Sequence, residues 1–163
     1  MTALNTFVFW AALLIAAPAL AADGATTDET ELPPLERWLL DPTEQFLAAD
    51  ISLEDFRWIA RPLVIFADTE ADPRFRQQID RLAARPEALA ERDVVIFVDT
   101  DPSAQSEVRK ALRPRGFMIV LIGKDGGVKL RKPFPWDVRE LSRQIDKMPM
   151  RQQEIRDAKE AAQ

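Results

Sequence analysis

The 163-residue sequence contains no cysteine, no histidine and no tyrosine. Without cysteine there is no thiolate nucleophile, disulfide or iron–sulfur ligand, and without histidine the usual proton shuttle and the commonest metal ligand are missing. These absences exclude thiol oxidoreductase and cysteine peroxidase chemistry. Any catalysis would have to use Asp, Glu, Lys, Arg, Ser or Thr, and we expect neither a cofactor nor a bound metal.

Basic residues are also fewer than acidic ones: the chain has 22 Lys and Arg against 27 Asp and Glu, and its formal net charge is -5. A nucleic-acid-binding protein needs a clustered positive surface to displace counterions, so this balance argues against nucleic acid as a partner. Hydrophobic residues make up 47% of the chain, which is ordinary for a globular protein. At this length we expect one folded domain.

The N-terminus has the pattern of an export signal. A short uncharged apolar run over residues 7–17 is followed by Ala19-Leu20-Ala21, which fits a signal-peptidase site. We therefore predict a signal peptide over residues 1–21, with an uncleaved anchor as the alternative. The run is shorter than the roughly 20 apolar residues that span a bilayer, so we expect a periplasmic or secreted protein with no stable membrane span after cleavage.

An acidic stretch follows the predicted cleavage site. Between residues 22 and 50 a single basic residue, Arg37, stands against the acids Asp23, Asp28, Glu29, Glu31, Glu36, Asp41, Glu44 and Asp50. We interpret residues 22–50 as an acidic leader, partly flexible, that carries short amphipathic pieces. The remaining chain divides into a folded domain over residues 51–150 and a polar C-terminal tail over residues 151–163.

Strand and helix signals alternate within residues 51–150. Residues 63–67 (LVIFA) and 94–98 (VVIFV) are continuous β-rich apolar runs, typical of strands that are buried on both faces. Asp72-Pro73 marks the start of a helix between them, which should break near Pro86. This βαβ unit favours parallel pairing with a right-handed crossover.

A hairpin and a final helix complete the pattern. Residues 117–122 and 128–130 are apolar runs separated by a turn with Asp-Gly, which favours an antiparallel hairpin. The last helix begins at Asp137, with Glu140 as its capping-box partner. The order β, α, β, α, β, β, α predicts an α/β, thioredoxin-like three-layer fold: a mixed sheet with helices on both faces. A flavodoxin-like sheet would have a helix in place of the late hairpin.

Five short segments carry a resemblance to a known family. They are residues 61–67 (RPLVIFA), 72–78 (DPRFRQQ), 91–93 (ERD), 121–130 (LIGKDGGVKL) and 145–151 (IDKMPMR). Together they resemble the bacterial domain of unknown function 4174 family, related to the DUDES domains of vertebrate sushi-repeat and matrix-associated extracellular proteins. The resemblance covers about residues 52 to 154. It implies a thioredoxin-like, more nearly peroxiredoxin-like fold and an extracytoplasmic setting, and it brings no settled activity or catalytic residue.

Thioredoxins carry their redox cysteines between a strand and the helix that follows it. Matching the proline of that motif to Pro73 places Ala71 and Arg74 where the thiols would be. The same region is the first candidate ligand-binding site, formed by Asp68, Glu70, Asp72, Arg74 and Arg76, because ligands commonly bind at the carboxyl ends of strands in α/β folds. Its acids could bind a hard cation such as Ca²⁺ or supply a base. Alternatively, Asp72 only caps the helix and the other acids are solvated.

A second candidate is an interaction patch of basic residues around the late hairpin and the last helix, suited to an anionic partner or to a solvated surface. It consists of Lys124, Lys129, Arg131, Lys132, Arg139 and Arg143. The segment Met148-Pro149-Met150 either closes the core or forms a docking edge for a partner.

Three functional hypotheses remain open. The first is a non-catalytic binding or interaction module of the cell envelope, with an envelope protein or an anionic molecule as partner. The second is a carboxylate- or metal-dependent enzyme that uses the loop from Asp68 to Asp72. The third is an envelope stress or matrix-association factor that acts through the acidic leader or the basic patch.

Overall fold

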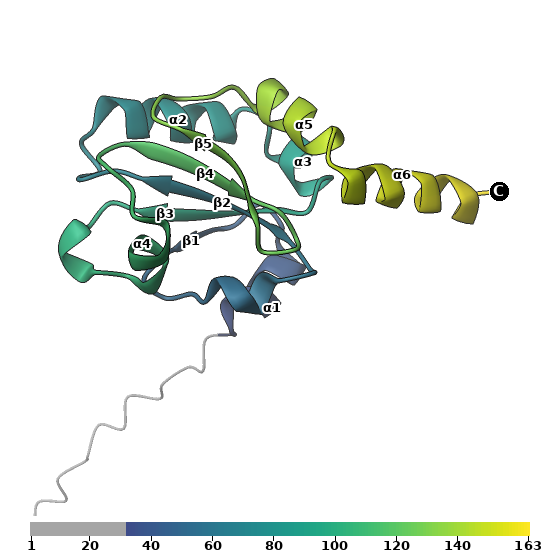
Figure 1. Ribbon diagram of the computed structural model, residues 1–163, viewed down its shortest axis with the longest axis horizontal. Helices are drawn as coiled ribbons and strands as arrows, with labels where there is room; N and C mark the ends of the chain where they lie inside the picture. The colour runs from purple at the N-terminus through teal and green to yellow at the C-terminus, as the bar shows by residue number, and fades with distance from the viewer. Residues whose placement is uncertain (1–31) are drawn as a thin grey trace, which may run out of the picture. The chain divides into compact units, whose positions relative to one another are not determined.

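The computed structural model describes residues 32–163, which form a five-stranded mixed sheet between two layers of helices (Figure 1). The strands are β1 (Gln45–Leu47), β2 (Arg61–Phe66), β3 (Val94–Asp99), β4 (Met118–Ile122) and β5 (Val128–Lys132). The predicted signal peptide and residues 22–31 of the predicted leader lie outside the described part of the chain.

Helices connect and flank the strands. The α-helices are α1 (Pro34–Leu40), α2 (Pro73–Ala83), α3 (Pro86–Ala90), α4 (Glu107–Leu112), α5 (Val138–Asp146) and α6 (Pro149–Ala161). Two short 3₁₀ helices, η1 (Leu53–Phe56) and η2 (Pro102–Ala104), precede β2 and α4. The predicted break near Pro86, in the helix that begins at Asp72-Pro73, is confirmed. α2 and α3 are separate helices, and Pro86 is the first residue of α3.

The strand order across the sheet is β1-β3-β2-β4-β5. β3 runs parallel to both β1 and β2, whereas β4 is antiparallel to β2 and to β5. In the centre of the sheet, Leu63 of β2 lies opposite Ile96 of β3 on one side and Leu121 of β4 on the other. The predicted parallel unit and antiparallel hairpin are both confirmed, and this order with helices on both faces is that of a thioredoxin-like fold.

The central strands are apolar because both of their faces are covered, except for Arg61 at the start of β2 and Asp99 at the end of β3. All six residues of β2 are buried. Val64 and Phe66 point into the core on one face of the sheet, and Leu63 and Ile65 point into the core on the other. A strand with only one covered face would alternate apolar with polar residues.

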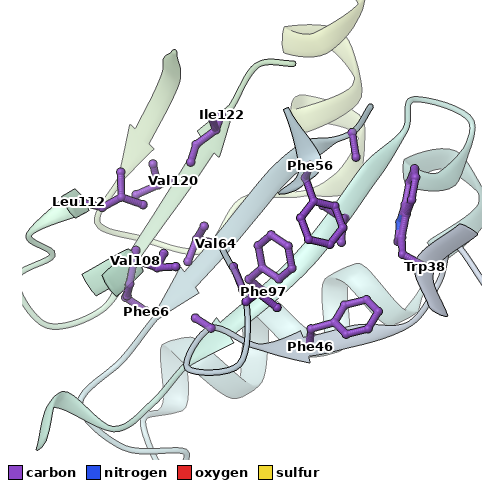
Figure 2. Packing of buried hydrophobic residues seen from close by; sticks show 14 residues of the cluster. Trp38, Phe46, Phe56, Val64, Phe66, Phe97, Val108, Leu112, Val120 and Ile122 are labelled. Carbon is purple, nitrogen blue, oxygen red and sulfur yellow. The ribbon is translucent and has the colours of Figure 1, made fainter. Parts of the chain in front are cut away.

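One core lies between the sheet and the layer that contains α1, η1 and α4. Its centre is aromatic: the ring of Phe56 meets that of Phe97 edge-on at 5.1 Å between centroids, and Trp38 meets Phe56 at 6.5 Å (Figure 2). Phe46 adds a tilted contact with Phe97 at 6.2 Å. Edge-to-face packing of this kind adds to the free energy gained by burial alone.

The second core lies between the opposite face of the sheet and the helices α2, α3 and α5. Leu82 of α2, Leu89 of α3 and Leu141 of α5 are at most 2% exposed and pack against it. The predicted capping box at the start of α5 is confirmed, since Asp137 accepts from the Arg139 amide at 2.7 Å and Glu140 accepts from the Asp137 amide.

Two boundaries differ from the sequence-based prediction. β1 falls inside residues 22–50 and pairs with β3, so the folded domain begins before residue 51. A strand of three residues has too little periodicity to be recognised, and the edge of β3 supplies its hydrogen bonds. The predicted polar tail forms most of α6, which extends beyond the sheet in Figure 1 and has no buried residue. Its Gln, Glu, Arg, Lys and Ala residues favour helix without tertiary packing.

Residues 32–163 contain no helix with the length and apolarity needed to cross a bilayer.

The position of β1 in the core yields the first prediction. Replacing Phe46, which is 5% exposed, by alanine should lower the free energy of unfolding by about 3–5 kcal/mol, because it removes a buried ring and leaves a cavity beside Phe97. The neighbouring Leu47 is 56% exposed, so Leu47→Ala should change stability by less than about 0.5 kcal/mol. Urea unfolding followed by circular dichroism measures both. Equal, small effects would place this segment outside the core.

Candidate functional site

The first predicted site is the loop between β2 and α2. Asp72 caps α2: its carboxylate accepts a hydrogen bond from the Arg74 amide at 2.8 Å, and Pro73 is the first residue of the helix. The capping role predicted for Asp72 is thereby confirmed. The residues matched to the thioredoxin thiols, Ala71 and Arg74, flank this helix start, where a redox pair would lie.

Arg74 is held in place by its own loop. Its Nη2 lies 2.9 Å from Oδ2 of Asp72, and its guanidinium carbon lies 5.5 Å from the centre of the Phe117 ring. The side-chain hydrogen bond from Arg74 lowers the pKa of Asp72 below its usual value. A carboxylate stabilised in its ionised form is a weak base, so Asp72 is poorly suited to general-base catalysis at neutral pH.

Glu70 and Arg76 do not join this pair, whereas the Asp68 carboxylate acts on Arg74 electrostatically and helps to raise the pKa of its guanidinium. Arg76 donates from Nε to the carbonyl of Glu70 at 3.3 Å. Arg74 and Arg76 line a shallow groove along the exposed side of α2, together with Pro73, Gln77 and Asp80. The carboxylates of Asp68 and Glu70 are exposed loop groups.

The loop acids do not form a metal site. Within residues 32–163, no group of three or more Asp, Glu, His or Cys side chains is placed to hold a metal ion. The hypothesis of a cation bound by Asp68, Glu70 and Asp72 requires such a convergent set of oxygen ligands. The described structure does not supply it.

A buried ion pair lies directly behind the loop. Asp99, the last residue of β3, is 6% exposed and Arg109 of α4 is 9% exposed. Arg109 donates to Oδ1 of Asp99 at 2.7 and 3.0 Å and to the carbonyl of Ala67 at 2.9 Å. Ser106 donates to the other carboxylate oxygen at 2.7 Å. The network ties the ends of β2 and β3 to α4.

This pair is not among the site residues predicted from the sequence. Asp99 directly follows the apolar run 94–98, and Arg109 precedes the buried Leu112 by three residues on the same side of α4. The three-residue spacing between Arg109 and Leu112 was the sequence signal that Arg109 is buried, because it directs the Arg109 side chain toward the sheet. It could not identify the partner, which is ten residues away and belongs to a strand.

A second polar network occupies the opposite end of the sheet, around Arg61. Arg61 is 1% exposed although it carries a full charge. Its guanidinium donates to the carbonyl of Arg92 at 2.9 Å, to Asp93 at 3.4 Å and to Glu154 of α6 at 2.8 Å. A buried charge is tolerated only when it is paired and hydrogen-bonded in this way.

Lys124, from the turn between β4 and β5, completes the network. Its Nζ lies 2.7 Å from Asp93 and 3.0 Å from Glu154, and Arg151 lies 3.2 Å from Glu154. Burial raises the pKa of Glu154, but the hydrogen bonds from Arg61 and Lys124 outweigh it, so the net shift is downward. The network therefore favours the ionised carboxylate.

Four of the five segments that carry the family resemblance meet at this network, and the fifth, residues 72–78, forms the start of α2. Arg61 belongs to the segment 61–67, Arg92 and Asp93 to 91–93, and Lys124 to 121–130. The segment 145–151 contributes through Asp146, which pairs with Arg92 through two hydrogen bonds of 2.9 Å. Segments far apart in the sequence are thus joined by ion pairs.

A cavity of about 240 Å³ lies beside this network. Its lining consists of Arg61, Gly123, Lys124, Asp125, Lys129, Met148, Pro149 and Met150. Concave sites with mainly apolar walls and a few convergent polar groups are the usual form of small-ligand sites. The predicted docking edge Met148-Pro149-Met150 is one wall of this cavity, while Met148 is 8% exposed and packs on the core.

Trp58 lies next to the same turn in a strained conformation. Its φ of 66° is in the left-handed region, which bulky residues rarely adopt and which costs about 1–3 kcal/mol. The Trp58 amide donates to the carbonyl of Lys124 at 2.7 Å, while its indole is 61% exposed. The strained backbone thereby fixes the position of Lys124.

The six residues of the predicted basic patch do not gather on one surface. Arg131 donates to the carbonyl of Leu112 at 2.6 Å, on the face of the sheet covered by α4. Its neighbour Lys132 points to the other face, where its Nζ lies 4.5 Å from the Trp136 ring. Lys124 and Lys129 line the cavity. Arg139 and Arg143 line a groove between α3 and α5.

Comparison with a family model gives a match to residues 52–154, and the family is described as Domain of unknown function (DUF4174). Comparison with curated proteins gave no match.

Comparison with solved structures gives matches that include three proteins. The reduced 2-Cys peroxiredoxin of Plasmodium vivax is 18% identical over 59% of this chain and 81% of that one, with a TM-score of 0.48. Thioredoxin peroxidase I of Plasmodium yoelii is 19% identical over 59% and 76%, with a TM-score of 0.43. StoA from Bacillus subtilis is 11% identical over 52% and 81%, with a TM-score of 0.35.

The buried pair behind the loop predicts a large effect of removing one partner. Asp99→Ala should lower the free energy of unfolding by about 3–5 kcal/mol, because it leaves the Arg109 guanidinium buried without a counter-ion. Asp101→Ala is the matched control: it removes an exposed acid that caps η2 and should cost about 1 kcal/mol. Urea unfolding of both variants makes the comparison. Equal losses would contradict a structural role for the pair.

The network around Glu154 predicts a pH-dependent stability difference. Because the folded state lowers the pKa of Glu154, its contribution to stability is complete above the unfolded pKa and is lost as the pH falls through the folded value. The wild-type protein should therefore be more stable than Glu154→Gln at pH 7, and the difference should shrink below about pH 4. Thermal unfolding between pH 3 and 7 tests this, with Glu160→Gln on the exposed end of α6 as control. A difference that grew on acidification would contradict the assignment.

Proposed function

The chain belongs to the DUF4174 family, and from that premise we propose that this thioredoxin-like domain without cysteine is a non-catalytic binding or interaction module of the cell envelope. The observation that supports this proposal most directly is the ion pair at the start of α2. Where a thioredoxin would hold its redox pair, this protein has Ala71 and Arg74, and Arg74 is bound by the cap residue Asp72. The residues at this position can bind a charged group, but they include no nucleophile.

The same geometry disfavours the enzyme hypothesis. A base at this site would need a carboxylate with a pKa near neutrality, whereas the pKa of Asp72 is lowered by Arg74. The buried Asp99 is fully engaged by Arg109 and Ser106. Within residues 32–163 no convergent acid set is available for a metal. Of the hypotheses considered, binding of a partner through charged and apolar surfaces is the one that this geometry supports.

The envelope setting of the proposal is supported by the sequence of residues 1–21 and by the extracytoplasmic setting that the family resemblance implies. An apolar run followed by Ala19-Leu20-Ala21 is the pattern of a cleaved export signal. An exported domain without cysteine takes no part in the thiol–disulfide chemistry of its compartment. A thioredoxin-like scaffold can then act in the envelope without entering disulfide exchange.

The exposed groove on α2 is the surface we assign to a macromolecular partner. Arg74 is 53% exposed at its side chain even though it is paired, and Arg76 lies next to it in the same groove. Arg74 donates from Nε and Nη2 to Asp72, whose side chain is largely covered. A guanidinium has further N–H donors, so an acidic partner can bind the exposed half of Arg74 without displacing Asp72. We therefore propose an envelope protein with an acidic surface as the partner.

A capture experiment tests this proposal. The tagged protein, recovered from the envelope fraction, should retain a partner that Arg74→Ala/Arg76→Ala loses at least tenfold, since two cationic contacts are removed. The double variant Arg139→Ala/Arg143→Ala reports on the second predicted surface, and Arg156→Ala on exposed α6 is the neutral control. Capture should weaken as salt is raised.

Three outcomes would contradict the proposal. They are salt-insensitive capture, recovery of the uncleaved chain from the cytoplasm, and turnover of a substrate that disappears on mutation of Asp72 or Arg76.

A further inference from the structure

The cavity beside the turn between β4 and β5 combines cationic side chains with an apolar wall. From its size, charge and lining we propose that it binds a small amphiphilic anion: a free carboxylic acid with a linear alkyl chain of about eight carbons. This inference deepens the proposed function by naming a ligand class, and it rests on that function only in that the protein acts by binding.

The apolar wall suits a flexible chain. Met148 is 8% exposed and Met150 is 37% exposed, and the two side chains flank Pro149 at the start of α6. Methionine is unbranched and polarisable, so it adapts to the shape of an alkyl ligand better than branched side chains do. Pro149 limits the backbone freedom of the same wall.

The charged part of the lining favours an anion. Arg61, Lys124 and Lys129 line the cavity, against Asp125 alone. The acids that balance Arg61 and Lys124, namely Asp93 and Glu154, are not part of the lining. A negatively charged head group therefore meets cations first.

The balance of charge favours a ligand with a single negative charge. The charged lining residues and the groups paired with them comprise three cations and three acids: Arg61, Lys124 and Lys129 against Asp93, Asp125 and Glu154. A monocarboxylate that takes the place of the Asp125 carboxylate at Lys129 carries the same charge as the group that it replaces, whereas a phosphate dianion brings one negative charge more.

Lys129 is the group that can reach the ligand. Its Nζ pairs with Asp125 at 2.6 Å, and both side chains are at least a third exposed, so the pair is weak. Exchange of Asp125 for a ligand carboxylate therefore costs little. A Cβ on Gly123 would come within 2.5 Å of the Lys129 side chain. Glycine at this position leaves room for the lysine to lie across the turn.

The head-group side of the cavity is already ordered. Arg61 is fixed by three acceptors from two segments, and the backbone of Lys124 is fixed by the Trp58 amide. A preformed site loses less conformational freedom when it binds a ligand. The strained φ of Trp58 is one way in which the fold holds this arrangement.

The volume sets the length of the chain. An apolar cavity of about 150 Å³ in another protein accommodates benzene. The cavity here is about 240 Å³, which in proportion holds about ten non-hydrogen atoms, the size of octanoate.

The experiment is a titration of the purified protein, carrying ¹³C-labelled methionine methyl groups, with octanoate well below its micelle concentration. Met148 and Met150 should show saturable shifts, assigned with Met148→Leu and Met150→Leu. Met118 serves as the internal control, because it pairs with Phe66 at the end of β2 opposite to Arg61. Affinity should fall about fourfold for each methylene removed from the chain. Octan-1-ol should bind about tenfold more weakly than octanoate, since it lacks the charge.

Variants separate the two halves of the site. Lys129→Gln should weaken octanoate about tenfold and leave octan-1-ol unchanged, so that the two ligands bind equally. Met150→Glu should weaken octanoate at least tenfold by placing a like charge in the wall. Arg143→Gln on α5, outside the cavity lining, should change neither affinity. Urea unfolding confirms that each variant is folded.

Several results would overturn the inference. They are the absence of saturable shifts at Met148 and Met150 at millimolar octanoate, equal shifts at Met118, and equal binding of octanoate and octan-1-ol to the wild-type protein. Tighter binding of N-acetylleucine than of octanoate would overturn the free acid in favour of a peptide C-terminus. Partner capture through Arg74 and Arg76 uses a different surface, so failure of either experiment is distinguishable from failure of the other.

Discussion

A charged guanidinium buried at the end of the central strand constrains much of this structure. Arg61 is 1% exposed, and a buried cation without counter-ions would destabilise the fold by several kcal/mol. Its acceptors come from the segment before β3 and from α6, and the same acids bind Lys124 from the hairpin turn. Four segments are therefore held together at one point. α6, which buries none of its residues, is tied to the domain mainly by this network.

The opposite end of the sheet follows the same physical rule. The pair of Asp99 and Arg109 joins the ends of β2 and β3 to α4 through hydrogen bonds to a backbone carbonyl and to Ser106. Each end of the central strands is thus closed by buried charge that is fully paired. The exposed loop at the start of α2 belongs to neither network, which is why we assign the groove of Arg74 and Arg76 to the proposed partner.

The cavity owes its form to the contrast between these rigid and adaptable parts. The ion-pair network and the Trp58 amide fix its polar side, whereas methionines form its apolar side. Three features that appear unrelated in the sequence line this one cavity. They are a glycine-rich turn, a Met-Pro-Met segment and an arginine before an apolar strand. No single one of them indicates a ligand by itself.

The sequence alone determined the architecture of residues 61–146. Apolar runs, proline and aspartate caps and an Asp-Gly turn act over a few residues, so the βαβ unit, the break at Pro86, the hairpin and the cap at Asp72 were all predictable. The absence of cysteine likewise excluded thiol chemistry without any coordinates. Only the tertiary structure showed that β1 joins the sheet, that Asp99 and Arg109 pair, and that the predicted basic residues lie at separate places. These features depend on contacts between segments that are distant in the sequence. A charged residue that is buried by such contacts is stable only when an oppositely charged or hydrogen-bonding group lies beside it.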